Sequence, residues 1–190
     1  PLIYWTITQS KNSKFKNNIY VSSDSEKILK FSKNLGCEII RRPNNISGDK
    51  ASTESAVKHF LKKTKKKYKY IILLQPTSPL RYSTDIDKAY AKIVKDNKNS
   101  LFSGSYYSDL TIWKKKQKLA PYNYNINKRL TRQEHGGFYL ENGSIYIFKP
   151  ELILNKNNRF DTNSISFYEM NKLQSLEIDD IDDFHICEEI

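Results

Sequence analysis

Apolar residues follow two different spacings along the first hundred positions of the chain. Helical spacing predicts three helices, which begin near Ser23 or Asp24, at Ser52, and at Ser83 or Thr84. Short apolar and β-branched runs predict strands at residues 19–22, 37–40, 70–74 and 101–103. Strands that alternate with helices are typical of parallel sheets covered on both faces. We therefore predict an α/β fold, a doubly wound three-layer α/β/α arrangement around a mostly parallel sheet.

The alternation stops at residues 106–141, which are polar, rich in Tyr and Lys, and without a sustained period. So long an irregular segment inside a compact domain is usually functional or part of an interface. Strands are predicted again at residues 144–148 and 165–168, and a closing helix at residues 181–190. We interpret residues 1–190 as one domain with an arm inserted at 106–141.

The composition excludes several classes of protein. With 190 residues, 38% of them hydrophobic and 13% aromatic, the chain can bury a core and is not a disordered segment. Its longest clean apolar run, Ile71–Leu74, is far too short to cross a membrane. Cys37 and Cys187 cannot form a disulfide framework, and the first residues lack the pattern of a secretory signal. We therefore expect a cytoplasmic protein.

The net charge of +11 leaves a second class of function open. Six lysines between residues 62 and 69 form a basic run that could attract nucleic acid, although the same run fits a solvated helix end. No zinc-finger spacing and no aromatic RNA-binding motif accompanies it. The solvated surface is therefore the favoured interpretation, and a basic nucleic-acid-binding protein is the alternative.

Two polar segments follow predicted strands, where open α/β sheets bind their ligands. Gln75–Arg81 comes directly after the most apolar strand; two prolines stiffen its backbone, and Gln75 can donate and accept hydrogen bonds toward a base or a sugar. Arg42 follows another strand, and Ser52 and Thr53 open the next helix. A guanidinium and a helix N-terminus are both suited to anions. A rigid turn and an ordinary helix cap are the structural alternatives.

The acidic segment near the C-terminus is a candidate metal site. Seven acidic residues lie between positions 177 and 189. Glu177 and Asp179 are separated by one residue, so an extended backbone places both carboxylates on one side, as a shared hard cation requires. A solvated acidic tail is the alternative. We find no Ser–His–Asp or Cys–His arrangement, no G-x-G-x-x-G and no Walker A motif, so covalent catalysis has no candidate residue.

Several strings of residues, in family order across essentially the whole chain, resemble motifs of the acylneuraminate cytidylyltransferases, also called CMP-sialic acid synthetases. These strings are Val21–Glu26, Leu74–Arg81, Arg132–Glu134, Tyr139–Tyr146, Phe167–Met170, Leu176–Asp179 and Asp183–Phe184. The string Leu74–Arg81 is specific for sugar cytidylyltransferases. The Arg-Gln and Glu-Asn-Gly-Ser strings resemble the sialic acid branch, and related enzymes for other nonulosonic acids look similar.

The resemblance implies a nucleotide-diphospho-sugar transferase-like (Rossmann-like) fold. The reaction that it implies joins CTP and a sialic or related nonulosonic acid to give a CMP-sugar and pyrophosphate. The anomeric hydroxyl of the sugar attacks the α-phosphorus, so catalysis depends on charge neutralisation and in-line positioning. The resemblance also implies Mg²⁺ as cofactor. Finally, it implies a homodimer or higher homo-oligomer in which the arm at 106–141 lends side chains to the partner's active site.

The resemblance assigns roles to individual residues of this sequence. Arg42, Ser52 and Thr53 line the nucleotide site; Gln75 and Tyr146 contact the sugar acid; Asn142 binds substrate; Arg132 and Gln133 approach the sugar and the phosphates as catalytic residues; and Glu177 and Asp179 hold Mg²⁺, with Asp179 also catalytic. No nucleic-acid or membrane partner is implied.

The sequence also departs from the family pattern. The family begins with a strand and a glycine-rich, basic loop that grips the CTP phosphates, and Pro1–Ile3 matches the residues that follow this loop. We therefore expect residues 1–190 alone to be inactive or nearly so, and a non-catalytic fragment or pseudoenzyme of the same fold is a further alternative. Thr131, Leu140 and Glu177 stand where relatives often have Arg, Arg and Asp, which bears on the identity of the sugar.

Overall fold

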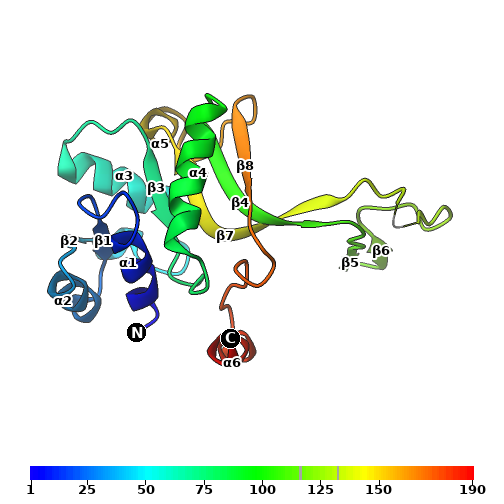
Figure 1. Cartoon of the computed structure of the whole chain (residues 1–190), viewed down its shortest axis with the longest axis horizontal. Coiled ribbons are helices and arrows are strands. Elements are labelled where there is room, and N and C mark those ends of the chain that lie inside the picture. Colours follow the sequence, from blue (N-terminus) through cyan, green and yellow to red (C-terminus); the bar gives the residue numbers. More distant parts are fainter. Residues whose placement is uncertain (116, 132) are drawn as a thin grey trace.

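A four-stranded sheet forms the centre of the computed structural model, which describes residues 1–115, 117–131 and 133–190. Its strand order is β3 (Ile71–Leu74), β7 (Phe138–Phe148), β4 (Ser100–Tyr107) and β8 (Ile165–Glu169). Strands β3, β4 and β8 run in one direction, and β7 lies antiparallel between β3 and β4 (Figure 1). The predicted mostly parallel sheet is confirmed, with β7 as the strand of opposite direction.

A second, smaller sheet pairs β1 (Tyr20–Ser23) in parallel with β2 (Glu38–Arg41). Helix α2 (Glu26–Asn34) connects the two strands. Its N-cap is Ser25, whose hydroxyl accepts from the Ile28 N–H, and not Ser23 or Asp24 as the sequence predicted. Beyond its last residue, Asn34, the chain turns at Gly36, whose φ of +76° glycine adopts without strain.

Helices cover both faces of the four-stranded sheet. On one face, Ile86, Ala89 and Ile93 of α4 (Ser83–Lys95) pack against Leu101, Ile145 and Ile147, and α1 (Ile3–Lys11) lies beside α4. On the other face, Val57 and Leu61 of α3 (Thr53–Thr64) and Leu152 and Ile153 of α5 (Pro150–Lys156) pack against Tyr146 and Phe148. Alternate residues of β7 therefore enter opposite cores, as the period of two along a strand requires. The predicted three-layer α/β/α arrangement is confirmed. The sequence pattern had not indicated α1 or α5.

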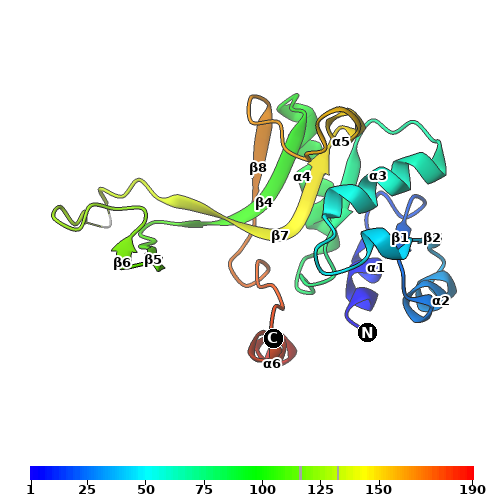
Figure 2. The same cartoon turned by 180° about the vertical axis from the view of Figure 1, so that it is seen from behind.

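The arm is built on the extended ends of β4 and β7. These strands remain paired as far as Tyr107 and Phe138, beyond the edge of the sheet, and a small hairpin of β5 (Trp113–Lys115) and β6 (Leu119–Pro121) follows (Figure 2). The β4–β7 register shifts between Phe102 and Gly104, and a Cβ at Gly104 would lie 2.2 Å from the Leu140 carbonyl oxygen. Glycine thus permits the close approach that a β-bulge needs at the base of the arm.

The C-terminal segment ends in α6 (Ile181–Glu189), close to the predicted helix. Asp180 caps it by accepting from the Asp182 and Asp183 N–H groups, while the Asp183 carboxylate accepts from the Asp180 N–H. Part of the acidic cluster therefore has a structural role. A short 3₁₀ turn, η1 (Asn44–Ile46), precedes α3. No helix in the part of the chain that the structure describes is long and apolar enough to cross a membrane.

Candidate active site

The loop that follows β3 is held in place by a buried arginine. Arg81 is 1% exposed, and its guanidinium donates to the Ser144 carbonyl oxygen (2.7 Å), the Ser144 Oγ (3.0 Å), the Thr6 Oγ1 (2.9 Å) and the Gln9 Oε1 (3.2 Å). Burial lowers its pKa to about 10, although Asp85 opposes the shift. Arg81 thus stays protonated at neutral pH and connects α1, the loop and β7. The sequence analysis had given Arg81 no role, because its partners lie far away along the chain.

A cluster of four residues lies at the carboxyl end of β3. The Thr77 Oγ1 donates to the Glu177 Oε1 at 2.8 Å. With its amide nitrogen turned toward them, Gln75 donates to the Gly143 carbonyl oxygen at 2.9 Å and to the same Glu177 oxygen at 3.2 Å. Gly143 has a φ of +63°, and a Cβ there would lie 2.5 Å from the Gln75 amide and 2.6 Å from the Glu177 Oε1. The cluster therefore requires glycine at position 143.

Two of the residues predicted for the site, Gln75 and Glu177, are thus in contact. The sequence analysis did not assign Thr77, although it lies inside the Gln75–Arg81 loop and carries a hydroxyl. Asp179 is exposed, and its backbone N–H donates to the Asp183 carboxylate at 2.9 Å. The cap of α6 therefore fixes the backbone at Asp179.

The donor set at this end of the sheet suits a hard cation. Glu177 and Asp179 offer only carboxylate oxygens, which Mg²⁺ prefers, and Mg²⁺ usually takes one or two carboxylates together with substrate phosphates. Among the described residues, no group of three or more His, Cys, Asp or Glu side chains could hold a metal ion by itself. The residues present fit Mg²⁺ if oxygens from a phosphate ligand complete the coordination.

Asn142 is buried beside this cluster, and its amide is occupied within the protein. Its Oδ1 accepts from the Ser103 Oγ at 2.7 Å and from the Ser144 N–H at 3.2 Å. Its Nδ2 donates to the Ser175 Oγ at 2.9 Å and contacts the Met170 Sδ at 3.3 Å. In this structure Asn142 connects β7 to β4 and to the C-terminal segment. Its predicted substrate-binding role stays a prediction.

Tyr146 lies on the face of β7 opposite to that of Ile145 and Ile147, and it contacts charged groups. Its hydroxyl donates to the Glu141 carboxylate, and burial, followed by this bond, raises the pKa of the hydroxyl. The guanidinium carbon of Arg159 lies 4.4 Å from the centre of the Tyr146 ring, and the Arg159 Nε lies 3.4 Å from the Glu54 Oε1. Arg159, which the sequence analysis missed, thus connects the start of α3 to the predicted sugar-binding tyrosine.

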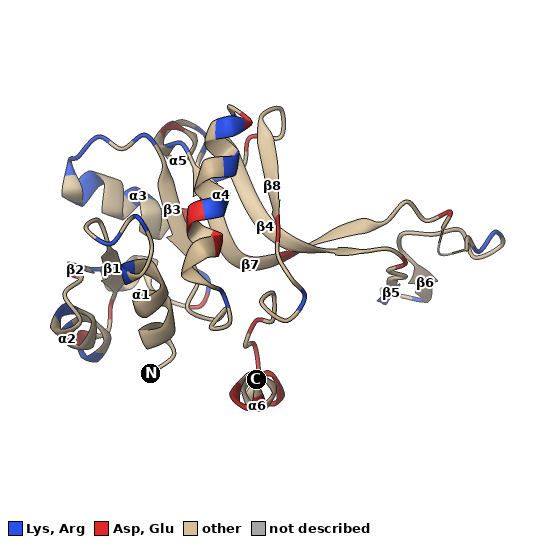
Figure 3. Ribbon diagram, viewed as in Figure 1, with Lys and Arg blue, Asp and Glu red and all other residues tan. Residues whose placement is uncertain are grey.

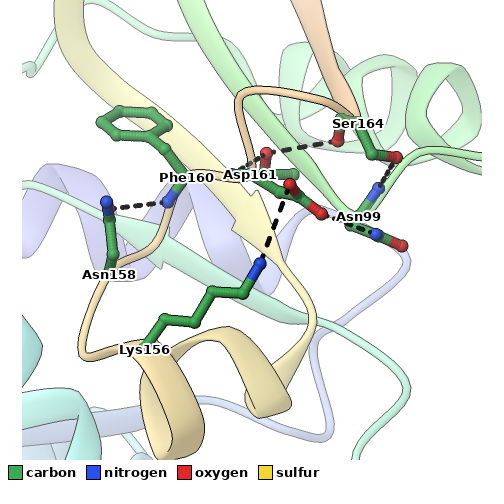
Figure 4. Close-up of polar contacts among 7 residues, drawn as sticks. Asn99, Lys156, Asn158, Phe160, Asp161 and Ser164 are labelled. Atoms are coloured by element: carbon green, nitrogen blue, oxygen red, sulfur yellow. Dashed lines mark hydrogen bonds and ion pairs between the residues drawn. The ribbon is translucent and has the colours of Figure 1, made fainter.

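The turn that carries Arg159 is anchored by Asp161 (Figure 4). The Asp161 Oδ2 accepts from the Asn99 Nδ2 at 2.8 Å, and its Oδ1 lies 4.0 Å from the Lys156 Nζ. Its backbone N–H donates to the Ser100 Oγ at 2.9 Å, and its carbonyl oxygen accepts from the Ser164 N–H at 2.8 Å. The bond from Asn99, together with nearby Lys156, holds the pKa of the Asp161 carboxyl below its ordinary value. This network joins the amino ends of β4 and β8.

The residues predicted for the nucleotide lie near α3. Arg42 directly follows β2; its Nη2 lies 4.0 Å from the Asp24 Oδ1, and its Nε is enclosed without a hydrogen-bond partner among the described residues. Ser52 is the N-cap of α3, because its hydroxyl accepts from the Ser55 N–H, and Thr53 is the first residue of that helix. Ser52 is therefore a helix cap in this structure, and the nucleotide-binding roles of Ser52 and Thr53 stay predictions.

The sequence analysis predicted two site residues on the arm, Arg132 and Gln133. Arg132 lies outside the described residues. Gln133 is exposed and lies between β6 and β7, in the arm that extends away from the sheet in Figure 1.

Basic side chains are spread over separate elements. Figure 3 shows Lys and Arg at the end of α3, along α4 and in the arm, whereas Asp and Glu gather on α6. This distribution fits solvated surfaces on several elements more closely than one basic stripe for nucleic acid.

Comparisons with known proteins agree on one family. The sequence profile of the family described as "Cytidylyltransferase" matches residues 1–190. Among curated proteins, N-acylneuraminate cytidylyltransferase A of Danio rerio is 31% identical over 96% of this chain and 43% of its own length. The N-acylneuraminate cytidylyltransferase of Escherichia coli O18:K1:H7 is 30% identical over 98% of this chain and 45% of its own length. The chain therefore spans less than half the length of these two relatives.

A shorter relative and two solved structures extend the comparison. "Post-translational flagellin modification protein B" of Campylobacter coli is 28% identical over 98% of this chain and 82% of its own length. The structure of CMP:2-keto-3-deoxy-manno-octonic acid synthetase complexed with CTP has a TM-score of 0.61 at 14% identity, over 90% of this chain and 79% of that one. The 4-diphosphocytidyl-2C-methyl-D-erythritol synthase of Anaerococcus prevotii has a TM-score of 0.70 at 11% identity, over 99% and 84%. At these identities the two structures support the nucleotide-diphospho-sugar transferase fold.

Proposed function

The chain belongs to the cytidylyltransferase family, and we propose that the protein activates a sialic or related nonulosonic acid with CTP, giving a CMP-sugar and pyrophosphate. The observation that supports this most directly is the cluster of Gln75, Thr77, Gly143 and Glu177 at the carboxyl end of β3. Ligands of open α/β sheets bind at such ends. The two N-acylneuraminate cytidylyltransferases support the sialic acid class.

In the proposed reaction the anomeric hydroxyl of the sugar acid attacks the α-phosphorus of CTP in line with the departing pyrophosphate. Arg42 and the start of α3 would bind the nucleotide, and Tyr146 with Arg159 would border the sugar acid. The buried Arg81 keeps the loop rigid, so that Gln75 and Thr77 need no reorganisation when substrates bind. These residues bind and orient; none of them forms a covalent bond with substrate.

We propose Mg²⁺ as the cofactor, held by Glu177 and Asp179 together with the triphosphate. When bound, the ion would neutralise charge on the phosphates. Titration of CTP with and without Mg²⁺ tests this part of the proposal: the ion should tighten CTP binding, and equal affinities in both conditions would contradict it.

We further propose that the arm mediates a homodimer or higher homo-oligomer. Large apolar side chains are exposed on the arm, including Trp113, Leu119, Tyr122 and Ile126. Leu119→Glu should lower the mass measured by light scattering. Leu154→Glu on α5, also at an exposed position, should not. A strict monomer in the unchanged protein at high concentration would overturn this proposal.

We also propose a cytoplasmic location. The two unpaired cysteines fit this location, and cell fractionation would test it.

The central test measures pyrophosphate release with CTP, Mg²⁺ and a panel of acids. Like the activity assays in the Discussion, it uses residues 1–190 preceded by the strand and glycine-rich loop with which the family begins. The panel contains N-acetylneuraminic acid, other nonulosonic acids and 2-keto-3-deoxy-octonic acid, with ATP and GTP as nucleotide controls. We expect release with CTP and with at least one nine-carbon acid. Release with only the eight-carbon acid would reassign the substrate, and no release with any acid would overturn the proposed activity.

A further inference from the structure

Glu177 is held by two side chains at one of its two carboxylate oxygens. The Thr77 Oγ1 and the Gln75 amide nitrogen both donate to the Oε1, at 2.8 Å and 3.2 Å. Close packing against Gly143, where a Cβ would lie 2.6 Å from Oε1 and 2.9 Å from Oε2, restricts the same carboxylate from another side. Two segments that are distant from Glu177 along the chain, the Gln75–Arg81 loop and the turn at Gly143, thus fix the orientation of this carboxylate.

Thr77 contacts the acidic segment through its backbone as well. The Ile178 N–H donates to the Thr77 carbonyl oxygen at 2.8 Å, so both the hydroxyl and the carbonyl of Thr77 bind neighbouring residues of that segment. The backbone bond would persist in any substitution at position 77. The hydroxyl can therefore be removed while the loop stays attached to the segment.

A carboxylate with one oxygen saturated by donors keeps the other oxygen for a further partner. Groups that hydrogen-bond to a metal ligand fix its orientation, and their loss typically weakens metal affinity by about 10- to 100-fold.

We propose that Thr77 is a positioning residue, whose hydroxyl orients Glu177 so that the second carboxylate oxygen is available to the divalent cation that accompanies CTP. This inference rests on the proposed function. It assigns to the Gln75–Arg81 loop a role in metal binding, in addition to its role as a rigid turn.

The test uses Mn²⁺ as a spectroscopic probe in place of Mg²⁺, with CTP present. Free Mn²⁺ is followed by electron paramagnetic resonance as protein is added, and the melting temperature of each variant is recorded. Thr77→Val, which keeps the shape but removes the hydroxyl, should weaken Mn²⁺ binding by about 10-fold or more. Thr77→Ser should bind within about 3-fold of the unchanged protein. In both variants, CTP affinity measured without metal should stay unchanged.

Two controls identify the cause of the effect. Thr64→Val removes a hydroxyl that donates to the Phe60 carbonyl oxygen within α3, and it should leave Mn²⁺ affinity unchanged. In a Glu177→Gln background, Thr77→Val should have little further effect, because coupled residues are not additive. If Thr77→Val proves unstable, Thr77→Ala compared with Thr77→Ser makes the same test.

The outcomes separate this inference from the proposed function. If the unchanged protein does not bind Mn²⁺ with CTP, the proposed function fails. If the unchanged protein binds but Thr77→Val binds equally well, only the inference fails. Equal losses in Thr77→Val and Thr77→Ser, or additive losses with Glu177→Gln, would also overturn it, because the effect would then not come from the hydroxyl acting on Glu177.

Discussion

Each end of the four-stranded sheet has a carboxylate held by surrounding loops, but the two are held differently. At the amino ends of β4 and β8, both oxygens of Asp161 meet protein groups, Asn99 at 2.8 Å and Lys156 at 4.0 Å. At the carboxyl end of β3, the Thr77 hydroxyl and the Gln75 amide both donate to the Glu177 Oε1. Asp161 thus has a lysine nearby, whereas the donors to Glu177 among the described residues are neutral side chains.

This difference distinguishes a structural carboxylate from a candidate functional one. A carboxylate with neutral partners still attracts a cation, whereas a nearby lysine offsets part of the charge of a carboxylate. Substitutions at the amino ends should therefore change the stability of the protein. Substitutions at the carboxyl end should change turnover and the binding of substrates and metal.

The largest expected effect is a loss of stability at the carboxyl end of the sheet. It is an exception to the rule above, because the buried Arg81 stabilises the fold there. Arg81→Met should lower the free energy of unfolding by about 3–5 kcal/mol, since several buried acceptors lose their donor at once. Urea denaturation measures the change. Arg41→Met, at an exposed ion pair with Glu26, is the control and should change stability by less than about 1 kcal/mol. Similar stabilities for the two variants would contradict the role assigned to Arg81.

The next largest effect is a loss of turnover at the proposed metal site. Asp179→Asn should reduce turnover by about 100-fold or more, since a developing phosphate charge loses its counterion, while the melting temperature stays nearly constant. Steady-state pyrophosphate release measures the turnover. Asp182→Asn, on the neighbouring α6, is the matched control and should retain activity. Normal turnover of Asp179→Asn with Mg²⁺ would make the acidic segment a solvated tail.

Asp161→Ala tests the amino end. It should lower the melting temperature by roughly 5 °C, because Asn99 and Lys156 lose their partner, while the KM values for substrates stay unchanged. Asp49→Ala, in an exposed loop, should leave the melting temperature unchanged. A variant of normal stability with altered kinetics would reverse the roles of the two ends.

The pH dependence provides an internal check on Asp161→Ala. The pKa of the Asp161 carboxyl is lower in the folded protein than in the unfolded chain. Its stabilising contribution is therefore complete above the unfolded value of about 4 and is lost as the pH falls through the folded value. The difference in melting temperature between Asp161→Ala and the unchanged protein should shrink as the pH is lowered below about 4.

The smallest expected effect concerns Gln75. Gln75→Ala removes one of the two donors to Glu177, so kcat/KM should fall by about 10-fold with little change in melting temperature. The separate KM values for the sugar acid and CTP show whether Gln75 also contacts the sugar, as the family resemblance implies. A large loss of stability with normal kinetics would make Gln75 part of a rigid turn only.

Local spacing in the sequence determined most of the helices and strands of the body. Apolar residues at a period of 3.6 or 2 bury one face of a helix or strand, so the pattern indicated α2, α3, α4, α6 and the strands that alternate with them. It also placed Gln75 at the end of a strand and identified Glu177 and Asp179 as oxygen ligands. Short elements without a clear period, α1, α5 and the β5–β6 hairpin, left no such signal.

Only the tertiary structure decided how these elements meet. The antiparallel insertion of β7 between β3 and β4, the burial of Arg81, and the position of Arg159 over Tyr146 all join residues far apart along the chain. The Thr77–Glu177 hydrogen bond spans 100 positions. Such contacts depend on strand order and on which loops share a sheet end, and local periodicity contains no information about either. The sequence therefore identified the chemical groups of the site, and the packing of the sheet determined which of them touch.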